Sequence, residues 1–266
     1  MTPTSNRALT RERLLLTAER LFAVHGIDAV SLRQISVAAG QRNNSAAQYH
    51  FGTKDDLIRA IFAFRLATIN RRREEMVDIL VRDGRTADLR ALTEAMVRPL
   101  AEQIDGGGSF YVRFLARVHQ HAGASVYALP AMGVEGSSTR IGRMIGAALV
   151  HLPSLVRRSR LQLGGSLAVH ATADREQRVH GGMPEDVLPP LVFVADLVDA
   201  VVGIFSAPVS EETLASIMST GCVPEDEAWV AVRRPGRAEP GSVAAAAPTA
   251  APTASPDGQA GRFAAG

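Results

Sequence analysis

The sequence predicts an all-helical protein, with a small N-terminal domain followed by a larger helical domain. Apolar residues recur every three or four positions along most of the chain, which is the period of a helix that packs on one side. No stretch of strand length alternates between apolar and polar residues. Apolar residues make up 46% of the 266 residues and aromatic residues only 5%, so aliphatic side chains would fill the core.

The N-terminal domain is predicted over residues 10–70, behind a flexible arm formed by residues 1–9. Its first helix covers residues 10–25, with Thr10 as an acceptable N-cap. Gly26 ends this helix, because glycine readily adopts the left-handed backbone that closes a helix.

Two short helices follow, and a long fourth helix comes after them. Ser31 caps the second helix and Gly40 ends it. Asn43 or Asn44 begins the third helix, and Thr53 caps the fourth, which extends to about residue 80. Apolar residues would hold the two short helices together: Leu32, Ile35, Ala39, Ala46 and Ala47.

Polar side chains would then face outward from the third helix and from the turn before it. They are Gln41, Arg42, Asn43, Asn44, Ser45 and Gln48. Arginine, asparagine and glutamine carry paired donors and acceptors that match the base edges in the major groove of DNA. A helix-turn-helix reads a DNA sequence by presenting such side chains from a small helical unit. This segment therefore predicts sequence-specific DNA binding.

The charge distribution favours the same interpretation. Residues 1–73 contain twelve arginines and lysines and five acidic residues, a net charge of +7, whereas the rest of the chain carries −5. A basic N-terminal domain on a mildly acidic body is typical of a protein that binds a polyanion through one end.

The larger domain is predicted over residues 71–220, and residues 221–266 are predicted to be a disordered tail rich in alanine, proline and glycine. A glycine triplet at residues 106–108 separates two of its helices. The expected helices cover residues 87–104, 110–121, 138–151, 154–177, 187–206 and 211–219.

Other classes of protein find little support in the sequence. Cys222 is the only cysteine, which excludes an intrachain disulfide and a cysteine-based zinc site and favours a cytoplasmic location. Asp196, Asp199 and two prolines interrupt the most apolar segment, residues 187–205, so no membrane span is expected. We find no nucleophile–base pair, phosphate-binding loop or metal motif, and we expect no catalytic residue, metal or cofactor.

Two segments carry a resemblance to a known family, namely ERLFAVHGIDAVSLRQISVAAG and YHFGTKDDLIRAIF. They resemble the N-terminal domain of the tetracycline-repressor (TetR) family of bacterial transcription regulators. The resemblance implies a helix-turn-helix at about residues 33–52 and a ligand-responsive transcription regulator, more often a repressor than an activator. A DNA-associated architectural protein without an inducer and a helical enzyme stay open as alternatives.

The resemblance also implies roles for single residues. Ser31, Tyr49, His50, Lys54 and Arg11 would contact backbone phosphates, and Arg33 and Gln41 would lie in the same interface. The residues that would face bases are Arg42, Asn43, Asn44, Ser45 and Gln48. One departure leaves the base contacts open: eight residues, where the family usually has seven, separate Gly40 from Tyr49, and Gln48 replaces the first aromatic residue of the family's pattern.

In the resembled family, the last two long helices pair with those of a second copy. The matching segments are residues 154–177 and 187–206, and the second is apolar nearly all round, which favours a homodimer on a palindromic operator. The predicted dimer interface consists of Leu163, Leu167, Val194, Leu197, Val198, Val201, Val202 and Phe205. Gly164 and Gly165 would allow a partner helix to approach closely.

By the same resemblance, residues 87–150 would enclose a small molecule, of apolar or amphipathic character. The candidate walls are Leu100, Ile104, Phe110, Phe114, Leu115, Val118, Met132 and Met144. The same residues also describe an ordinary helical core, and for any one of them the core is the safer interpretation.

Overall fold

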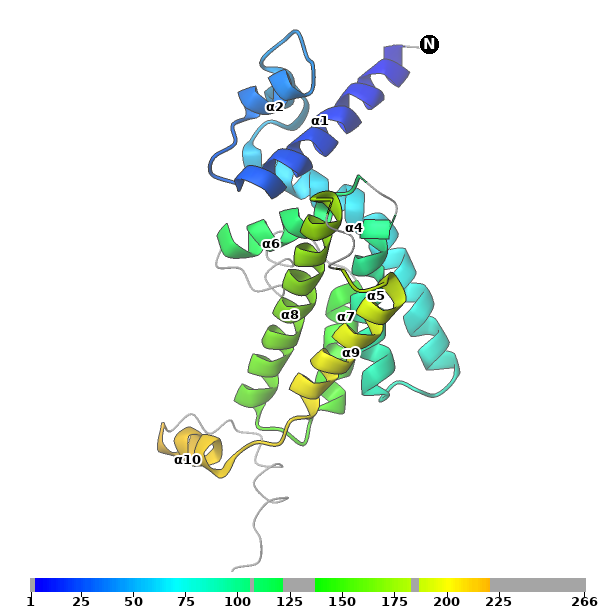
Figure 1. Cartoon of the computed structure of the whole chain (residues 1–266), viewed down its shortest axis with the longest axis vertical. Helices are drawn as coiled ribbons and strands as arrows, with labels where there is room; N and C mark the ends of the chain where they lie inside the picture. Colours follow the sequence, from blue (N-terminus) through cyan, green and yellow to red (C-terminus); the bar gives the residue numbers. More distant parts are fainter. Residues whose placement is uncertain (1–2, 106–107, 122–136, 183–186, 221–266) are drawn as a thin grey trace, which may run out of the picture. The chain divides into compact units, whose positions relative to one another are not determined.

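The computed structural model describes residues 3–105, 108–121, 137–182 and 187–220, and within these ranges every regular element is a helix (Figure 1). The helices are α1 (Pro3–His25), α2 (Leu32–Ala38), α3 (Ala46–Phe51), α4 (Lys54–Arg82), α5 (Leu89–Asp105), α6 (Tyr111–His121), α7 (Ser137–Ala148), α8 (Ser154–His180), α9 (Pro190–Ser206) and α10 (Glu211–Ser219). The predicted all-helical fold is confirmed. The predicted tail, residues 221–266, lies outside the described residues.

The first helix is longer than the sequence predicted. Helix α1 begins at Pro3, so residues 3–9 are helical and the predicted flexible arm is wrong for them. Proline is favoured in the first turn of a helix, where its missing N–H has no acceptor in any case. Arg7, Ala8 and Leu9 are good helix formers and carry the helix on towards Thr10.

The predicted caps of α2 and α4 are present with their full geometry. The hydroxyl of Ser31 accepts a hydrogen bond from the backbone N–H of Gln34, and the side chain of Gln34 accepts one from the N–H of Ser31. Thr53 and Asp56 form the same reciprocal pair at the start of α4. Such capping boxes fix where a helix begins, because they satisfy N–H groups that have no partner inside the helix.

The four N-terminal helices enclose one apolar core. Its fully buried side chains include Leu14, Phe22, Ile35, Leu57 and Ile61, drawn from α1, α2 and α4. The four alanine and isoleucine positions predicted to join α2 to α3 are buried, and Leu32 is half-buried against them.

A second core lies among α4, α5, α7, α8 and α9, and it corrects the predicted dimer interface. Val194, Leu197, Val198, Val201 and Phe205 of α9 are buried within the single chain, so they are not available to a second copy. Leu167 and Val202 are half-buried beside this core, and of the predicted interface residues only Leu163 is exposed. The apolar pattern of α9 therefore reflects packing inside the protomer more than pairing between protomers.

Gly164 of α8 is the point at which α9 comes closest. A Cβ added at Gly164 would lie 2.6 Å from the ring of Phe205 and 3.2 Å from Cγ1 of Val201. Arg160, one turn earlier, donates to the carbonyl oxygens of Phe205, Ala207 and Pro208 at the end of α9. The close approach that this glycine allows is thus made by α9 of the same chain, and not by the partner helix that the sequence suggested.

Helix α6 connects the N-terminal helices to the larger body through two buried carboxylates. Glu19 of α1 accepts a hydrogen bond from the N–H of Phe110 at 3.0 Å, and its two carboxylate oxygens accept from Nε and Nη2 of Arg65. Glu176 of α8 accepts hydrogen bonds from the N–H groups of Val112 and Arg113. The first turn of α6 is therefore held from both sides.

Within the described residues no single helix is long and apolar enough to cross a membrane. Helices α9 and α10 reach that length and composition only when they are taken together, and the pair is bent by 55°.

Gly164→Ala should destabilise the protein, although alanine is the better helix former by about 1 kcal/mol. The added methyl group overpacks the ring of Phe205, and we expect a net loss of about 1–3 kcal/mol in the free energy of unfolding. Gly146→Ala in α7 is the matched control, because its Cβ would lie 3.6 Å from the nearest atom, a methyl group of Leu161. Denaturant unfolding measures both variants, and equal stability of the two would contradict the close contact.

Acid should weaken the fold through His119 of α6. Burial lowers the pKa of His119 from its ordinary 6.5 to about 4, and the nearby His170 adds to the shift. Because the folded chain keeps this imidazole neutral, its contribution to stability is present above pH 6.5 and is lost as the pH falls through about 4. His119→Leu should remove a loss of about 3 kcal/mol across this interval. If the free energies of unfolding of the variant and the wild type fell equally between these pH values, the role of His119 would be contradicted.

Candidate nucleic-acid interface

The turn between α2 and α3 is built by glycine geometry and one buried hydroxyl. Gly40 has φ of 70°, its N–H donates to the carbonyl of Val37, and the N–H of Gln41 donates to that of Ser36. These two bonds form a Schellman motif, which closes α2 and reverses the chain. The buried hydroxyl of Ser36 then accepts a hydrogen bond from the N–H of Ala47 at 2.9 Å, which fixes α3 against α2. The sequence did not single out Ser36 as a residue of the turn, although its position on the apolar face of α2 indicated that it would be buried.

The third helix begins later than predicted. Helix α3 starts at Ala46, so Asn43 and Asn44 lie in the preceding turn together with Arg42 and Ser45. Asn43 does not start the helix but shapes this turn, because its Oδ1 accepts a hydrogen bond from the N–H of Ser45 at 2.9 Å. Of the predicted base-facing residues, only Gln48 is carried by α3 itself.

Among the predicted base-facing amide and guanidinium side chains, three are exposed and without a partner among the described residues. In the part of the chain that the structure describes, Arg42, Asn44 and Gln48 make no side-chain hydrogen bond or ion pair. We call these three residues the polar tip. Gln41 differs, since it is half-buried and its Nε2 donates to the carbonyl of Ala39 at 3.4 Å. The polar tip therefore has its donors and acceptors free for an external partner.

A cationic edge lies beside the polar tip, where α1 passes the C-terminal end of α3. The guanidinium group of Arg11 lies 4.9 Å from the centre of the Phe51 ring, and that of Arg7 lies 5.6 Å from the Tyr49 ring. Tyr49 is 70% exposed. Arg7 was not predicted as a DNA contact, because residues 1–9 were expected to form a flexible arm. It precedes Arg11 by four residues, so the two share a face once α1 is extended. Tyr49 and two arginines thus form one exposed surface.

His50 lies next to this edge and is held neutral. Burial lowers the pKa of His50, and the positive charges of Arg7 and Arg11 lower it further. Its ring meets the Tyr49 ring edge to face, with centroids 5.4 Å apart. A neutral imidazole contacts a phosphate through a single N–H, without a charge of its own.

The two remaining predicted phosphate contacts, Lys54 and Ser31, and the predicted interface residue Arg33 are arranged in different ways. Nζ of Lys54 donates to the carbonyl of Ile27 at 3.0 Å, so this lysine ties the start of α4 to the turn after α1. The hydroxyl and the N–H of Ser31 both donate to the side chain of Gln34. Arg33 is exposed on α2. Lys54 therefore has a structural role that the sequence did not reveal, whereas Ser31 has the capping role that the sequence predicted.

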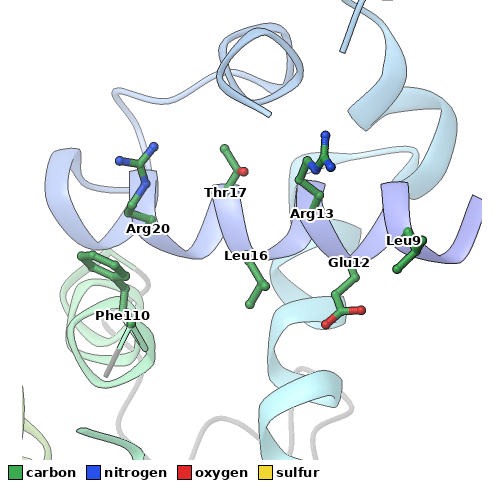
Figure 2. Close-up of a pocket in the computed structure, with 8 residues that line it drawn as sticks. Leu9, Glu12, Arg13, Leu16, Thr17, Arg20 and Phe110 are labelled. Atoms are coloured by element: carbon green, nitrogen blue, oxygen red, sulfur yellow. The ribbon is translucent and has the colours of Figure 1, made fainter. Parts of the chain in front are cut away.

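The predicted walls of a ligand pocket do not surround one cavity. Phe110 lines an open groove of about 540 Å³ along α1, where Arg13 and Arg20 point to one side of the helix and Glu12 and Leu16 to the other (Figure 2). Leu100 lines a separate cavity in the larger body. Phe114, Leu115 and Val118 are buried in the first core, and Ile104 is also buried. Met144 is half-buried beside the second core, and Met132 lies outside the described residues.

Of the comparisons with known proteins, the match to a family model falls on the helix-turn-helix. No curated protein matches the chain. Among solved structures, the chain is similar to NalD, the secondary repressor of the MexAB-OprM multidrug efflux pump in Pseudomonas aeruginosa, with 19% identity and a TM-score of 0.45 over 74% of this chain and 96% of that one. The family model of bacterial regulatory proteins, tetR family, matches residues 14–61, which run from α1 through α3 into α4. Over these residues the chain is similar to bacterial regulatory proteins of the tetR family.

Proposed function

We propose that the chain is a cytoplasmic transcriptional repressor that binds a palindromic DNA operator as a homodimer and leaves it when a small molecule binds. The observation that carries this proposal is the polar tip of Arg42, Asn44 and Gln48, which is exposed on a helix-turn-helix. Amide and guanidinium side chains without internal partners are suited to base edges. A protein that read only DNA shape would not need them, which argues against the architectural alternative.

Phosphate binding is assigned to the cationic edge of Arg7, Arg11 and Tyr49. Phosphate contacts position a helix-turn-helix on the duplex, whereas base contacts select the sequence. The edge supports this assignment because its two arginines stack on aromatic rings, which limits the number of conformations that they lose on binding. Arg33 on α2 adds a further exposed positive charge to the same domain.

The homodimer is proposed to form on the free faces of α8 and α9. Leu191 of α9 is 74% exposed and Leu163 of α8 is 56% exposed, and Val192 is also exposed. These side chains replace the buried residues of α9 that the sequence indicated. A two-fold dimer presents two identical helix-turn-helix units, which fits half-sites of opposite orientation.

Repression and release are the finer parts of the proposal. A bound dimer blocks other proteins by occupying its operator, so repression requires no further surface. Release follows if a ligand favours a dimer whose two helix-turn-helix units do not fit consecutive major grooves. The buried carboxylates at the first turn of α6 support such a linkage, because they connect α1 to α8 through α6.

Selection of bound DNA from a random pool tests the proposal directly. The full chain should enrich a palindrome whose half-sites lie about one helical turn apart. Enrichment of a single half-site would contradict the dimer, and no enrichment over the starting pool would contradict sequence-specific binding altogether.

Single substitutions should separate base contacts from phosphate contacts on the selected site. At least one of Asn44→Ala and Gln48→Ala should relax the preference at one base pair, by on the order of 1–3 kcal/mol. Arg11→Ala should instead weaken binding to selected and random DNA alike and reduce the salt dependence. The control is Arg82→Ala, which removes one exposed charge at the far end of α4. It should leave the DNA affinity and its salt dependence unchanged. If both polar-tip variants lost the same affinity for selected and for random DNA, direct reading of bases would be ruled out.

A further inference from the structure

A small cavity lies inside the larger body, away from the helix-turn-helix. Its volume is about 40 Å³, and its walls come from α4, α5, α7 and α8. Met96, Leu100, Ala168 and Val169 make the walls largely apolar, and Ser138 and Thr139 bring two hydroxyl groups. A single water needs roughly 10–15 Å³ of such space, so this cavity has room for more than one water.

Arg73 of α4 gives the cavity a buried positive charge. Its side chain lines the cavity, and the residue is only 4% exposed. Burial lowers the pKa of Arg73 to about 10, which still leaves the guanidinium group charged at neutral pH. The charge therefore has to be accommodated inside the protein.

The described residues offer little to offset this charge. Nη2 of Arg73 donates to the carbonyl of Met96 at 3.3 Å, whereas Nε is buried without a hydrogen-bond partner. Among the described residues no carboxylate forms an ion pair with Arg73. A buried charge without a counter-ion costs several kcal/mol, and buried charges in proteins are normally paired.

The phenol of Tyr111, at the start of α6, is a second unsatisfied donor near Arg73. Its hydroxyl is buried and has no hydrogen-bond partner. Burial raises the pKa of Tyr111, and the positive charge of Arg73 opposes that rise, so the two groups are electrostatically coupled. The coupled groups are both donors, and neither supplies a negative charge.

We propose that the cavity binds a small organic carboxylate and that Arg73 is its anionic anchor. The ligand's carboxylate accepts hydrogen bonds from the guanidinium group, and the remainder of this small acid faces Met96, Leu100 and Val169. The cavity volume of about 40 Å³ admits only a carboxylate of one or two carbon atoms, because benzene already needs a cavity of roughly 150 Å³. This inference rests on the proposed function only in its ligand-responsive part, for which it names the ligand class and the site.

Thermal unfolding of the full chain tests the site without DNA. Formate and acetate are titrated at constant ionic strength, with formamide and acetamide as uncharged analogues. At least one carboxylate should raise Tm saturably, by about 3 °C at tenfold excess over its Kd, and the amides should not. The absence of a saturable shift with every one of these carboxylates would overturn the proposal.

Two variants show whether Arg73 is responsible. Arg73→Met replaces the buried charge by an apolar side chain, so it should fold at least as stably as the wild type and lose the carboxylate shift. Arg72→Met removes the same charge from the neighbouring, exposed position and should keep the shift. A shift that persists in Arg73→Met would overturn the assignment. Operator binding measured without carboxylate tests the proposed function separately, so the two failures are distinguishable.

Discussion

Two buried carboxylates at the first turn of α6 hold the described part of the chain together as one unit. Glu19 comes from α1 and Glu176 from α8, and both accept hydrogen bonds from backbone N–H groups at the start of α6. The N-terminal end of a helix carries a partial positive charge, which stabilises nearby carboxylates. Each carboxylate also faces an arginine, Arg65 or Arg113. Helix α1, which packs against the helix-turn-helix, and helix α8, which packs against α9, thus depend on the same short stretch of backbone.

The cost of burial is compensated to different degrees for the two carboxylates, and this difference affects how firmly α6 is held. Glu19 forms a two-pronged pair with Arg65, at 2.6 and 2.7 Å, which compensates for its burial. For Glu176, burial raises the pKa to about 7, and the hydrogen bonds from Arg113 and Val112 oppose this only in part. Because the folded state favours the protonated form, the stability that Glu176 contributes is greatest at low pH and is lost as the pH rises through about 7. The attachment of α6 to α8 is accordingly the weaker of the two.

The sequence predicted the features that local chemistry decides. The caps at Ser31 and Thr53, the glycine at position 40 and the order of the helices could be read from residue types and spacing. Features that depend on distant neighbours could not be read in this way. The apolar residues of α9 show that the helix is buried, but not whether α5 and α8 or a second copy covers them. Lys54 appears as a free cation in the sequence, and only the fold brings the carbonyl of Ile27 to it.

Buried charged residues also depend on distant neighbours that the sequence does not show. Their partners in the structure distinguish a structural charge from a functional one. Glu19 and Arg73 are both almost completely buried, and neither stands out in the sequence from the charged residues around it. Glu19 has an arginine and a backbone N–H as partners, so its burial is explained by the fold itself. Arg73 has one carbonyl oxygen, an unsatisfied Nε and an adjoining cavity. A fold that needed only to fill this space would be served as well by an apolar side chain. The cost of keeping an arginine there is therefore best explained by an anion that occupies the cavity during function.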